Sequence, residues 1–215
     1  MARGRKWEMT ADKFLTLDEV RRLRQAVEAK AALDLAKGRT LWVKRWMLVD
    51  LALSSGLRVS EMVNLRCGDL RLGGKAHLVV RNGKGGKPGA VYLDTAFVRH
   101  LREYLTRKER VGEPLGVDDY LLCKLSGQPY TRDALHKTFK LCLEAAGIPR
   151  ERYSIHSARH TYCTYLYAAT KDLRLVQKQA RHSSPAVTAV YADVEPERMS
   201  EGVEAMRGMV GGGRR

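Results

Sequence analysis

The sequence lacks a long apolar run: none of its 215 residues belongs to a stretch approaching the roughly 18 apolar residues that cross a bilayer. The basic N-terminus, Met1–Lys6, has no apolar segment behind it, so a secretory signal is not expected either. Internal repeats and low-complexity linkers are also missing. With 44% hydrophobic and 29% charged residues, the composition is that of a folded protein. We expect a cytoplasmic location with no membrane partner.

Cysteine is scarce, and its spacing argues against a metal centre. None of the four cysteines forms a C-x-x-C pair. Only His160 and Cys163 stand at the spacing of two metal ligands, and no second pair lies nearby to complete a zinc site. We therefore interpret Cys67, Cys123, Cys142 and Cys163 as reduced thiols, mostly buried.

Acidic residues are outnumbered: 24 Asp and Glu stand against 39 Lys and Arg, which gives a formal net charge of +15. Such an excess favours a polyanionic partner. A ribosomal-type protein or a binder of anionic membranes would share this charge. The motifs described below favour nucleic acid among these classes.

Apolar periodicity and capping residues predict a mainly α fold with a small antiparallel β-sheet (α+β). Thr16–Glu19 has the form of a capping box, and the glycine-rich Asn82–Lys87 is typical of a hairpin tip. Ser60 is expected to cap a short helix, and a helix from Pro185 is expected to carry Tyr191 on its second turn. Helices are expected at residues 17–37, 41–53, 60–65, 96–110, 132–146, 157–169, 172–180, from 185 and at 196–209, with strands at 69–72, 76–81 and 90–93.

The stretch from His156 to Tyr191 contains groups that can grip a phosphodiester and attack it. His156 and Arg159 share one face of a helix start, where an arginine can direct two N–H donors at phosphate oxygens. Taken alone, this pair is more typical of a capping histidine and a surface arginine. Tyr191 would be a poor nucleophile unaided, because a phenol has a pKa of about 10. It needs a base and stabilising cations, and His182 precedes it in a capped turn.

Two upstream segments offer further cations. Arg58 follows a glycine turn among apolar residues, and Glu61 can orient its guanidinium, although a surface arginine in an ordinary ion pair fits as well. Lys84 lies at the hairpin tip, where it could enter a DNA minor groove and reach a leaving oxygen. Lys87 is the competing residue, and Gly-Lys-Gly tips are commonly solvated turns.

Together these motifs resemble those of tyrosine recombinases of the phage-integrase type. The matches occur in the family's order across residues 14–205, and their combination is far more specific than any one motif. They are Arg58 in Gly-Leu-Arg-x-Ser-Glu, Lys84 in Gly-Lys-Gly-x-Lys, the run His156-x-x-Arg159-His160-Thr161, His182-Ser183-Ser184 and Tyr191.

The resemblance implies the fold of a tyrosine-recombinase catalytic domain and an enzyme that cuts and rejoins DNA at a specific site. Tyr191 would attack the scissile phosphate and form a 3′-phosphotyrosyl link. Arg58 and Arg159 would hold the non-bridging oxygens and stabilise the transition state. Because the covalent link conserves the bond energy, neither ATP nor a metal cofactor is implied, in keeping with the lack of a Walker motif.

The remaining roles also come from the resemblance. Lys84 would protonate the leaving 5′ oxygen, His156 would accept the proton of Tyr191, and His182 would bind the phosphate. Glu61 and His160 are expected to support these groups.

Two departures from the family pattern bear on the site. Arg181 stands where the family usually has glycine before the second histidine, and it is expected to contact DNA. Pro88-Gly89 stands where the hairpin usually has a further basic residue. This leaves open whether Lys84 or Lys87 acts on the leaving group, with the other contacting DNA.

The motif boundaries predict a basic arm at residues 1–13, a catalytic domain at 14–195, and a C-terminal helix with a flexible tail at 196–215. The amphipathic tail is near neutral, and in the family such tails pack on a neighbouring subunit of a tetramer, so we expect self-association on DNA. No separate N-terminal core-binding domain is expected, and the chain is either a short recombinase or a catalytic-domain piece. Double-stranded DNA with a recombination site is the expected partner, in the nucleoid, with room for an accessory bending or directionality factor.

Two other functions stay open at this point. A type IB topoisomerase relaxes supercoils with similar groups, but most such enzymes have further domains, and His182-Ser183-Ser184 is integrase-like. A non-catalytic DNA-binding regulator could retain the fold. The complete set of catalytic groups argues against the regulator.

Overall fold

The computed structural model of the chain describes residues 13–81, 88–182 and 184–191. The N-terminal arm, Lys84 and Lys87 of the hairpin tip, the helix expected from Pro196 and the C-terminal tail lie outside these residues. Predictions about them therefore stay predictions. Within the described ranges, no helix is both long and apolar enough to pass through a membrane.

The fold begins with a pair of packed helices, and the first is capped as the sequence predicts. Ahead of α1 (Leu17–Ala36), the Thr16 hydroxyl accepts a hydrogen bond from the Glu19 N–H at 3.2 Å, and the Glu19 carboxylate accepts from the Thr16 N–H at 2.8 Å. α2 (Leu41–Ser55) packs along α1 and is largely buried. Gly56 ends α2 in the left-handed region at φ 60°, where a residue with a Cβ is strained by about 1–2 kcal/mol.

The other elements confirm the predicted mainly α fold with a small antiparallel sheet. β1 (Leu70–Arg71), β2 (His77–Val80) and β3 (Gly89–Tyr92) pair antiparallel in that order. Leu78 lies opposite a residue of each neighbouring strand and is fully buried. The remaining elements are α3 (Val59–Asn64), the 3-10 helix η2 (Cys67–Asp69), α4 (Thr95–Arg110), α5 (Arg132–Ala145), α6 (Ile155–Thr170), α7 (Leu173–Ala180) and α8 (Pro185–Ala189).

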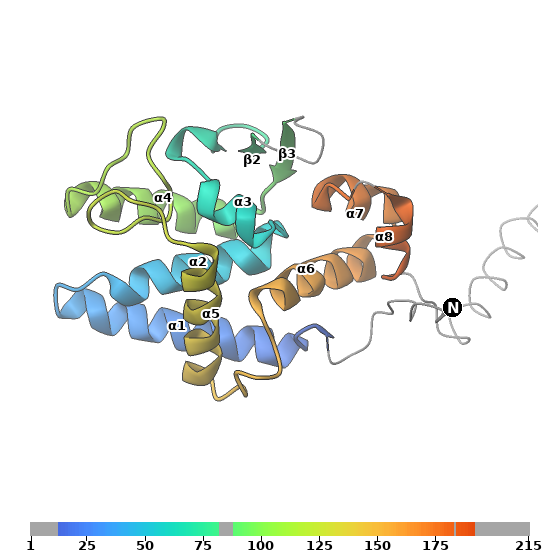
Figure 1. Ribbon diagram of the computed structural model, residues 1–215, viewed down its shortest axis with the longest axis horizontal. Helices are drawn as coiled ribbons and strands as arrows, with labels where there is room; N and C mark the ends of the chain where they lie inside the picture. Colours follow the sequence, from blue (N-terminus) through green and yellow to red (C-terminus); the bar gives the residue numbers. More distant parts are fainter. Residues whose placement is uncertain (1–12, 82–87, 183, 192–215) are drawn as a thin grey trace, which may run out of the picture.

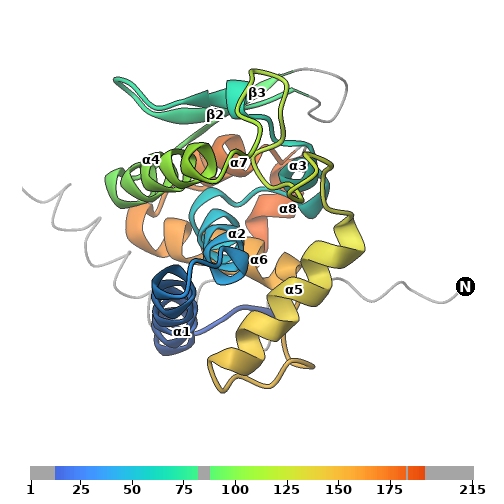
Figure 2. The same ribbon diagram turned by 90° about the vertical axis from the view of Figure 1, so that its left-hand side faces the viewer.

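α2 lies at the centre of the helical part, in contact with α1, α4, α5 and α6 (Figure 1). Figure 2 shows the sheet on the opposite side of the molecule from α1, with α4 and α2 between them. The Gln179 side chain of α7 joins the C-terminal helices to β3, because its amide accepts from the Tyr92 N–H at 3.2 Å and donates to the Tyr92 carbonyl at 2.7 Å. The described chain therefore returns to the sheet before it ends.

Two apolar clusters of unequal size stabilise this arrangement. The larger one extends over α1, α2, α4, α5 and the start of α6, with Met47 and Phe139 fully buried in it. The smaller one joins α6 and α7 to the end of the described chain. Its buried members are Cys163, Val176, Ala180 and Tyr191.

The prediction that Ser60 caps a helix was wrong by two residues. α3 begins at Val59, and Arg58 occupies the N-cap position. The Glu61 carboxylate accepts the Arg58 N–H at 2.6 Å, which is the side-chain half of a capping box and fixes the helix start without Ser60.

The prediction that Tyr191 lies on the second turn of a helix was also wrong. α8 ends at Ala189, and Tyr191 follows it. The Tyr191 N–H donates to the Thr188 carbonyl at 3.0 Å, an i to i+3 bond of the tighter kind that commonly ends a helix.

Candidate active site

Arg58 lies directly after the turn that ends α2. Its Nη1 donates to Glu61 Oε1 at 3.1 Å, and 36% of the Arg58 side chain is exposed, against 8% for Glu61. Glu61 also accepts the Arg58 backbone N–H. The carboxylate therefore fixes both the backbone and the guanidinium of Arg58, as the sequence predicts.

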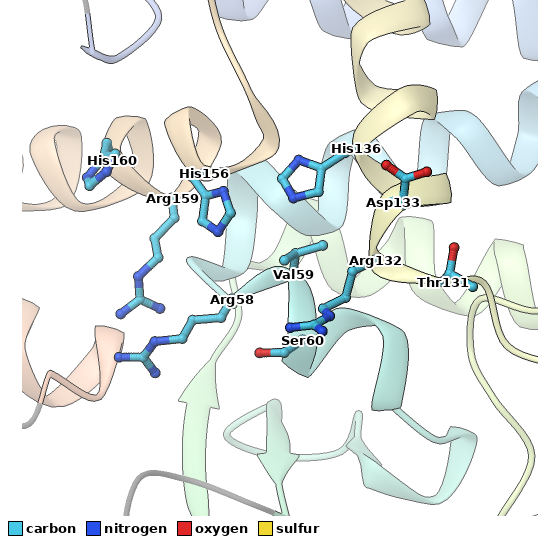
Figure 3. A pocket seen from close by; sticks show the side chains of 10 residues that line it. All are labelled: Arg58, Val59, Ser60, Thr131, Arg132, Asp133, His136, His156, Arg159 and His160. Carbon is cyan, nitrogen blue, oxygen red and sulfur yellow. The ribbon is translucent and has the colours of Figure 1, made fainter.

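Arg159 reaches the same place from α6, and only 7% of it is exposed. Its Nη1 donates to the Gly56 carbonyl, and its Nη2 donates to the Ala180 carbonyl at 2.6 Å. Burial lowers the pKa of the Arg159 guanidinium, which still remains charged at neutral pH. Figure 3 shows the Arg58 and Arg159 guanidiniums side by side, directed into the same space.

A cavity of about 740 Å³ opens beside these two arginines. His156 and His136 line it with their ring centroids 5.1 Å apart, and Arg132 extends it along the start of α5 (Figure 3). Burial, with smaller contributions from His136 and Arg159, lowers the pKa of His156. The cavity thus offers three guanidiniums and three imidazoles to an anion, and the Asp133 carboxylate is the one acidic group among the described residues of its lining.

Tyr191 lies in an adjoining cavity of about 610 Å³, which shares Arg58, Arg159 and His160 with the first. The Tyr191 hydroxyl oxygen is 2.9 Å from His160 Nδ1. Burial, reinforced by the neighbouring Cys163, raises the pKa of Tyr191 well above its ordinary value. The phenol is therefore protonated at neutral pH and needs a base before it can attack.

Two histidines beside Tyr191 are neutral. Burial, with Arg159 as the next cause, lowers the pKa of both His160 and His182 to about 4. The position of His182 is fixed by a 2.8 Å hydrogen bond between its Nδ1 and Thr188 Oγ1. The His182 ring lies parallel to the Tyr191 ring within 7°, at a centroid distance of 6.1 Å.

These groups suit phosphoryl transfer to a tyrosine. His160 is within the ~2.6–3.2 Å reach required of a general base; in the tautomer protonated on Nε2, its Nδ1 accepts the phenol proton. The two guanidiniums supply charge where a pentavalent phosphate would form. In the part of the chain that the structure describes, no group of three His, Cys, Asp or Glu side chains could hold a metal ion.

The structure brings most of the predicted site together but pairs the nucleophile differently. Arg58, His156, Arg159, His182 and Tyr191 all line the two cavities. The Tyr191 hydroxyl is hydrogen-bonded to His160, which was predicted only to support the site, and not to His156. The reason is that His160 lies one helical turn further along α6, toward α7 and α8.

Arg181 is little exposed to solvent, unlike a surface arginine that is available to contact DNA. Its side chain is 11% exposed, and its Nη2 lies 2.5 Å from Glu61 Oε2. The expectation that it contacts DNA stays a prediction. Lys84 and Lys87 are outside the described ranges.

Several residues at the site were missing from the sequence prediction. They are Arg132, His136, Cys163 and Thr188. Cys163 stands three residues after His160, so helical spacing could have indicated it. For Arg132 and His136 the sequence held no signal, because only the packing of α5 against α6 brings them to the cavity.

Several known proteins are similar to this chain. A model of the phage integrase family matches residues 13–198. The tyrosine recombinase XerH of Helicobacter pylori is 30% identical over 156 residues, which cover 72% of this chain and 42% of that protein. The tyrosine recombinase XerA of Pyrococcus furiosus is 28% identical over 213 residues, covering 98% and 68%.

Solved structures show the same similarity. A crystal structure of XerH bound to its difH substrate before cleavage gives a TM-score of 0.72 at 25% identity, covering 89% of this chain and 53% of that chain. The crystal structure of XerA gives a TM-score of 0.71 at 25% identity, covering 94% and 67%. The chain spans about half the length of several curated relatives it matches.

Proposed function

The chain belongs to the phage integrase family, and from this premise we propose that it is a site-specific tyrosine recombinase that cuts and rejoins DNA. One observation carries the proposal: Tyr191 lines one cavity together with Arg58, Arg159, His160 and His182. A phenol, two guanidiniums and two neutral imidazoles in one place are the groups that attack on a phosphodiester requires.

In the proposed reaction, the Tyr191 oxygen bonds to phosphorus while its proton passes to an imidazole. The bond from phosphorus to the 5′ oxygen breaks, and a 3′-phosphotyrosyl link remains. The leaving 5′ oxygen takes a proton, for which Lys84 is the proposed donor, and becomes a hydroxyl. Attack by a 5′-hydroxyl of another strand then restores both the phosphodiester and the free phenol, so the link needs no external energy source.

We propose His160 as the acceptor of the Tyr191 proton, with His156 as the alternative from sequence. The 2.9 Å contact supports His160. His160→Ala should then lower the cleavage rate of bound DNA by about 10²–10⁴-fold, the usual contribution of a general base. If His156→Ala has the larger effect and His160→Ala is nearly neutral, the sequence assignment is correct.

Double-stranded DNA is the proposed substrate, as XerH was crystallised with difH DNA. The net charge of +15 supports this, and the cavity continues past the reacting groups to Arg132, where a neighbouring backbone phosphate would fit. Arg132→Met should therefore weaken DNA binding while bound DNA is still cleaved. The slope of the binding constant against salt concentration, both as logarithms, should fall by about the amount expected for one phosphate contact.

The remaining partners are proposals from the sequence. The amphipathic C-terminal tail would contact a neighbouring subunit in a tetramer on DNA, with an accessory bending or directionality factor as a further partner. Nucleoid association would follow from DNA binding. Crosslinking on DNA with and without residues 196–215 tests the subunit contact.

A covalent-trapping assay tests the proposed function. A library of nicked duplexes, in which a cleaved strand loses its short 5′-hydroxyl fragment, is incubated with the chain, and covalent complexes are isolated under denaturing conditions. We expect trapping by the wild type and none by Tyr191→Phe, with DNA binding retained. Equal trapping by the phenylalanine variant would overturn the nucleophile assignment.

The same assay separates the alternative functions. A regulator that kept only the fold would bind duplexes without any covalent product. A type IB topoisomerase would relax supercoiled plasmids at similar rates whether or not they contain a site selected in the trapping assay. A recombinase should act on plasmids only where a selected site is present.

A further inference from the structure

Arg181 occupies a backbone position that normally favours glycine. It follows α7 with φ 54°, in the left-handed region, at the position where the family usually has glycine. Its carbonyl accepts from Arg58 Nη2 at 3.5 Å, and the preceding carbonyl, of Ala180, accepts from Arg159. The turn at Arg181 therefore contacts both catalytic guanidiniums through its backbone.

The Arg181 side chain runs inward from this turn to Glu61. Nη2 donates to Glu61 Oε2 at 2.5 Å, while Glu61 Oε1 accepts from Arg58 Nη1 at 3.1 Å. One carboxylate thus joins two guanidiniums. Burial acts to raise the pKa of Glu61, but Arg181, its hydrogen bonds and Arg58 together lower it, so the carboxylate is charged at neutral pH.

Gly89, which belongs to the second departure from the family pattern, lies against Arg181, which is the first. A Cβ added to Gly89 would stand 2.6 Å from Arg181 Cδ, so the glycine leaves room for the arginine stem. The Arg181 Nε and Nη1 are buried and have no hydrogen-bond partner among the described residues.

We propose that Arg181 is a positioning residue that balances the charge of Glu61, so that Arg58 stays available to the scissile phosphate. Arg58 and Arg159 bring two positive charges to the phosphate, but Glu61, which orients Arg58, cancels one of them. Arg181 restores the second charge, so the site matches a phosphorane that carries two negative charges. This inference rests on the proposed function.

A double-mutant cycle between Arg181 and Glu61 tests the inference on a duplex selected by wild-type trapping. Arg181→Met should slow cleavage of bound DNA by on the order of tenfold or more, as expected for directly coupled groups, with little change in affinity. Adding Glu61→Gln should recover most of that loss, because it removes the uncompensated charge and keeps an acceptor for the Arg58 N–H. Arg181→Lys, which keeps a cation, should cleave faster than Arg181→Met.

A readout without DNA accompanies the cycle. In the free protein, the ¹³C carboxyl signal of Glu61 should titrate at a higher pH in Arg181→Met than in the wild type, because a neighbouring cation is lost. Arg22→Met, which removes an exposed arginine paired with Asp18 on α1, is the matched control and should leave both cleavage and the Glu61 signal unchanged.

Three results would overturn the inference while leaving the proposed function intact. The first is wild-type cleavage by Arg181→Met. The second is weaker binding with a smaller salt dependence and no rescue by Glu61→Gln, which would make Arg181 a direct phosphate contact, as the sequence suggests. The third is an equal loss of thermal stability and cleavage in Arg181→Met and Arg181→Lys, which would make its role purely structural. Failure of the wild type to trap any duplex would instead contradict the proposed function.

Discussion

The arginine half of the site (Arg58, Arg159 and Glu61) and the tyrosine half (His182, Thr188 and Tyr191) rest on different parts of the fold. The arginine half lies where α2, α3 and α6 meet, against the larger apolar cluster. Hydrogen bonds to a carboxylate and three carbonyls, two of them at the end of α7, fix its guanidiniums. In the tyrosine half, His182 precedes the five-residue α8, Thr188 lies within it, and Tyr191 follows it and packs into the small cluster.

This difference matches what each half has to do in the proposed reaction. Cations that stabilise a transition state are most effective when they are held in place before the reaction. The tyrosine half contains the proposed nucleophile on a short segment with few buried apolar contacts, and such segments open most easily. We expect the arginine half to be rigid and the tyrosine half to open locally.

Among the variants that test this comparison, removal of Arg159 should have the largest effect on cleavage. Arg159→Ala deletes a transition-state cation, so we expect cleavage of bound DNA to fall by about 10²–10³-fold or more. It also leaves the buried carbonyls of Gly56 and Ala180 without their donor, at a cost of about 2–4 kcal/mol in unfolding free energy. Single-turnover cleavage and urea denaturation measure the two effects, and a stability equal to that of the wild type would contradict the buried anchoring.

Disturbing the turn beneath the arginines should have the next largest effect. In Gly56→Ala, the new Cβ would stand 2.5 Å from Tyr162 Cδ1 at a φ of +60°, so we expect about 2–4 kcal/mol of destabilisation and slower cleavage as the Gly56 carbonyl shifts from Arg159. Gly38→Ala is the matched control, because its φ is +66° and a Cβ there meets nothing within 4 Å. It should lose only about 1–2 kcal/mol and cleave normally. Equal losses in both variants would show that backbone strain alone is at work.

The sequence predicts the two halves unequally well, for physical reasons. Local signals place α1 and α5, because Thr16 and Thr131 cap them with their own side chains. The motifs also name the main site residues. The sequence does not predict which histidine is hydrogen-bonded to Tyr191. His156 and His160 share one face of α6, and only the position of α8 decides between them. No local signal shows that Arg181 turns inward to Glu61, since the contact joins segments 120 residues apart.

A pair of valine substitutions should sharpen the difference in rigidity. Val176→Ala removes two methyl groups from the small cluster, where Val176 is fully buried, and should cost about 1–3 kcal/mol. Because the cluster is small, we expect this loss of stability to appear as local opening. Amide exchange should become faster in α7 and α8 and change little in α2. Val27→Ala, in the larger cluster, should instead lower protection throughout. Uniformly faster exchange in Val176→Ala would mean that the halves unfold together.

The smallest effect concerns pH and belongs to the tyrosine half. His182 and His160 have folded pKa values of about 4, below the ordinary value of about 6.5 that they regain on unfolding. Between these values the unfolded chain binds more protons, so stability should fall as pH drops from about 7 to 4 and stay level above 7. Arg159, Arg58 and Arg181 surround His182 and favour its neutral form.

We expect each histidine to contribute about 1–2 kcal/mol to the unfolding free energy across this pH window. This is less than its full pKa shift would give, because both rings border an open cavity. Urea denaturation from pH 4.5 to 8 measures this, and His182→Gln should flatten the slope by about half. A slope unchanged by His182→Gln would show that His182 is not held neutral in the folded protein.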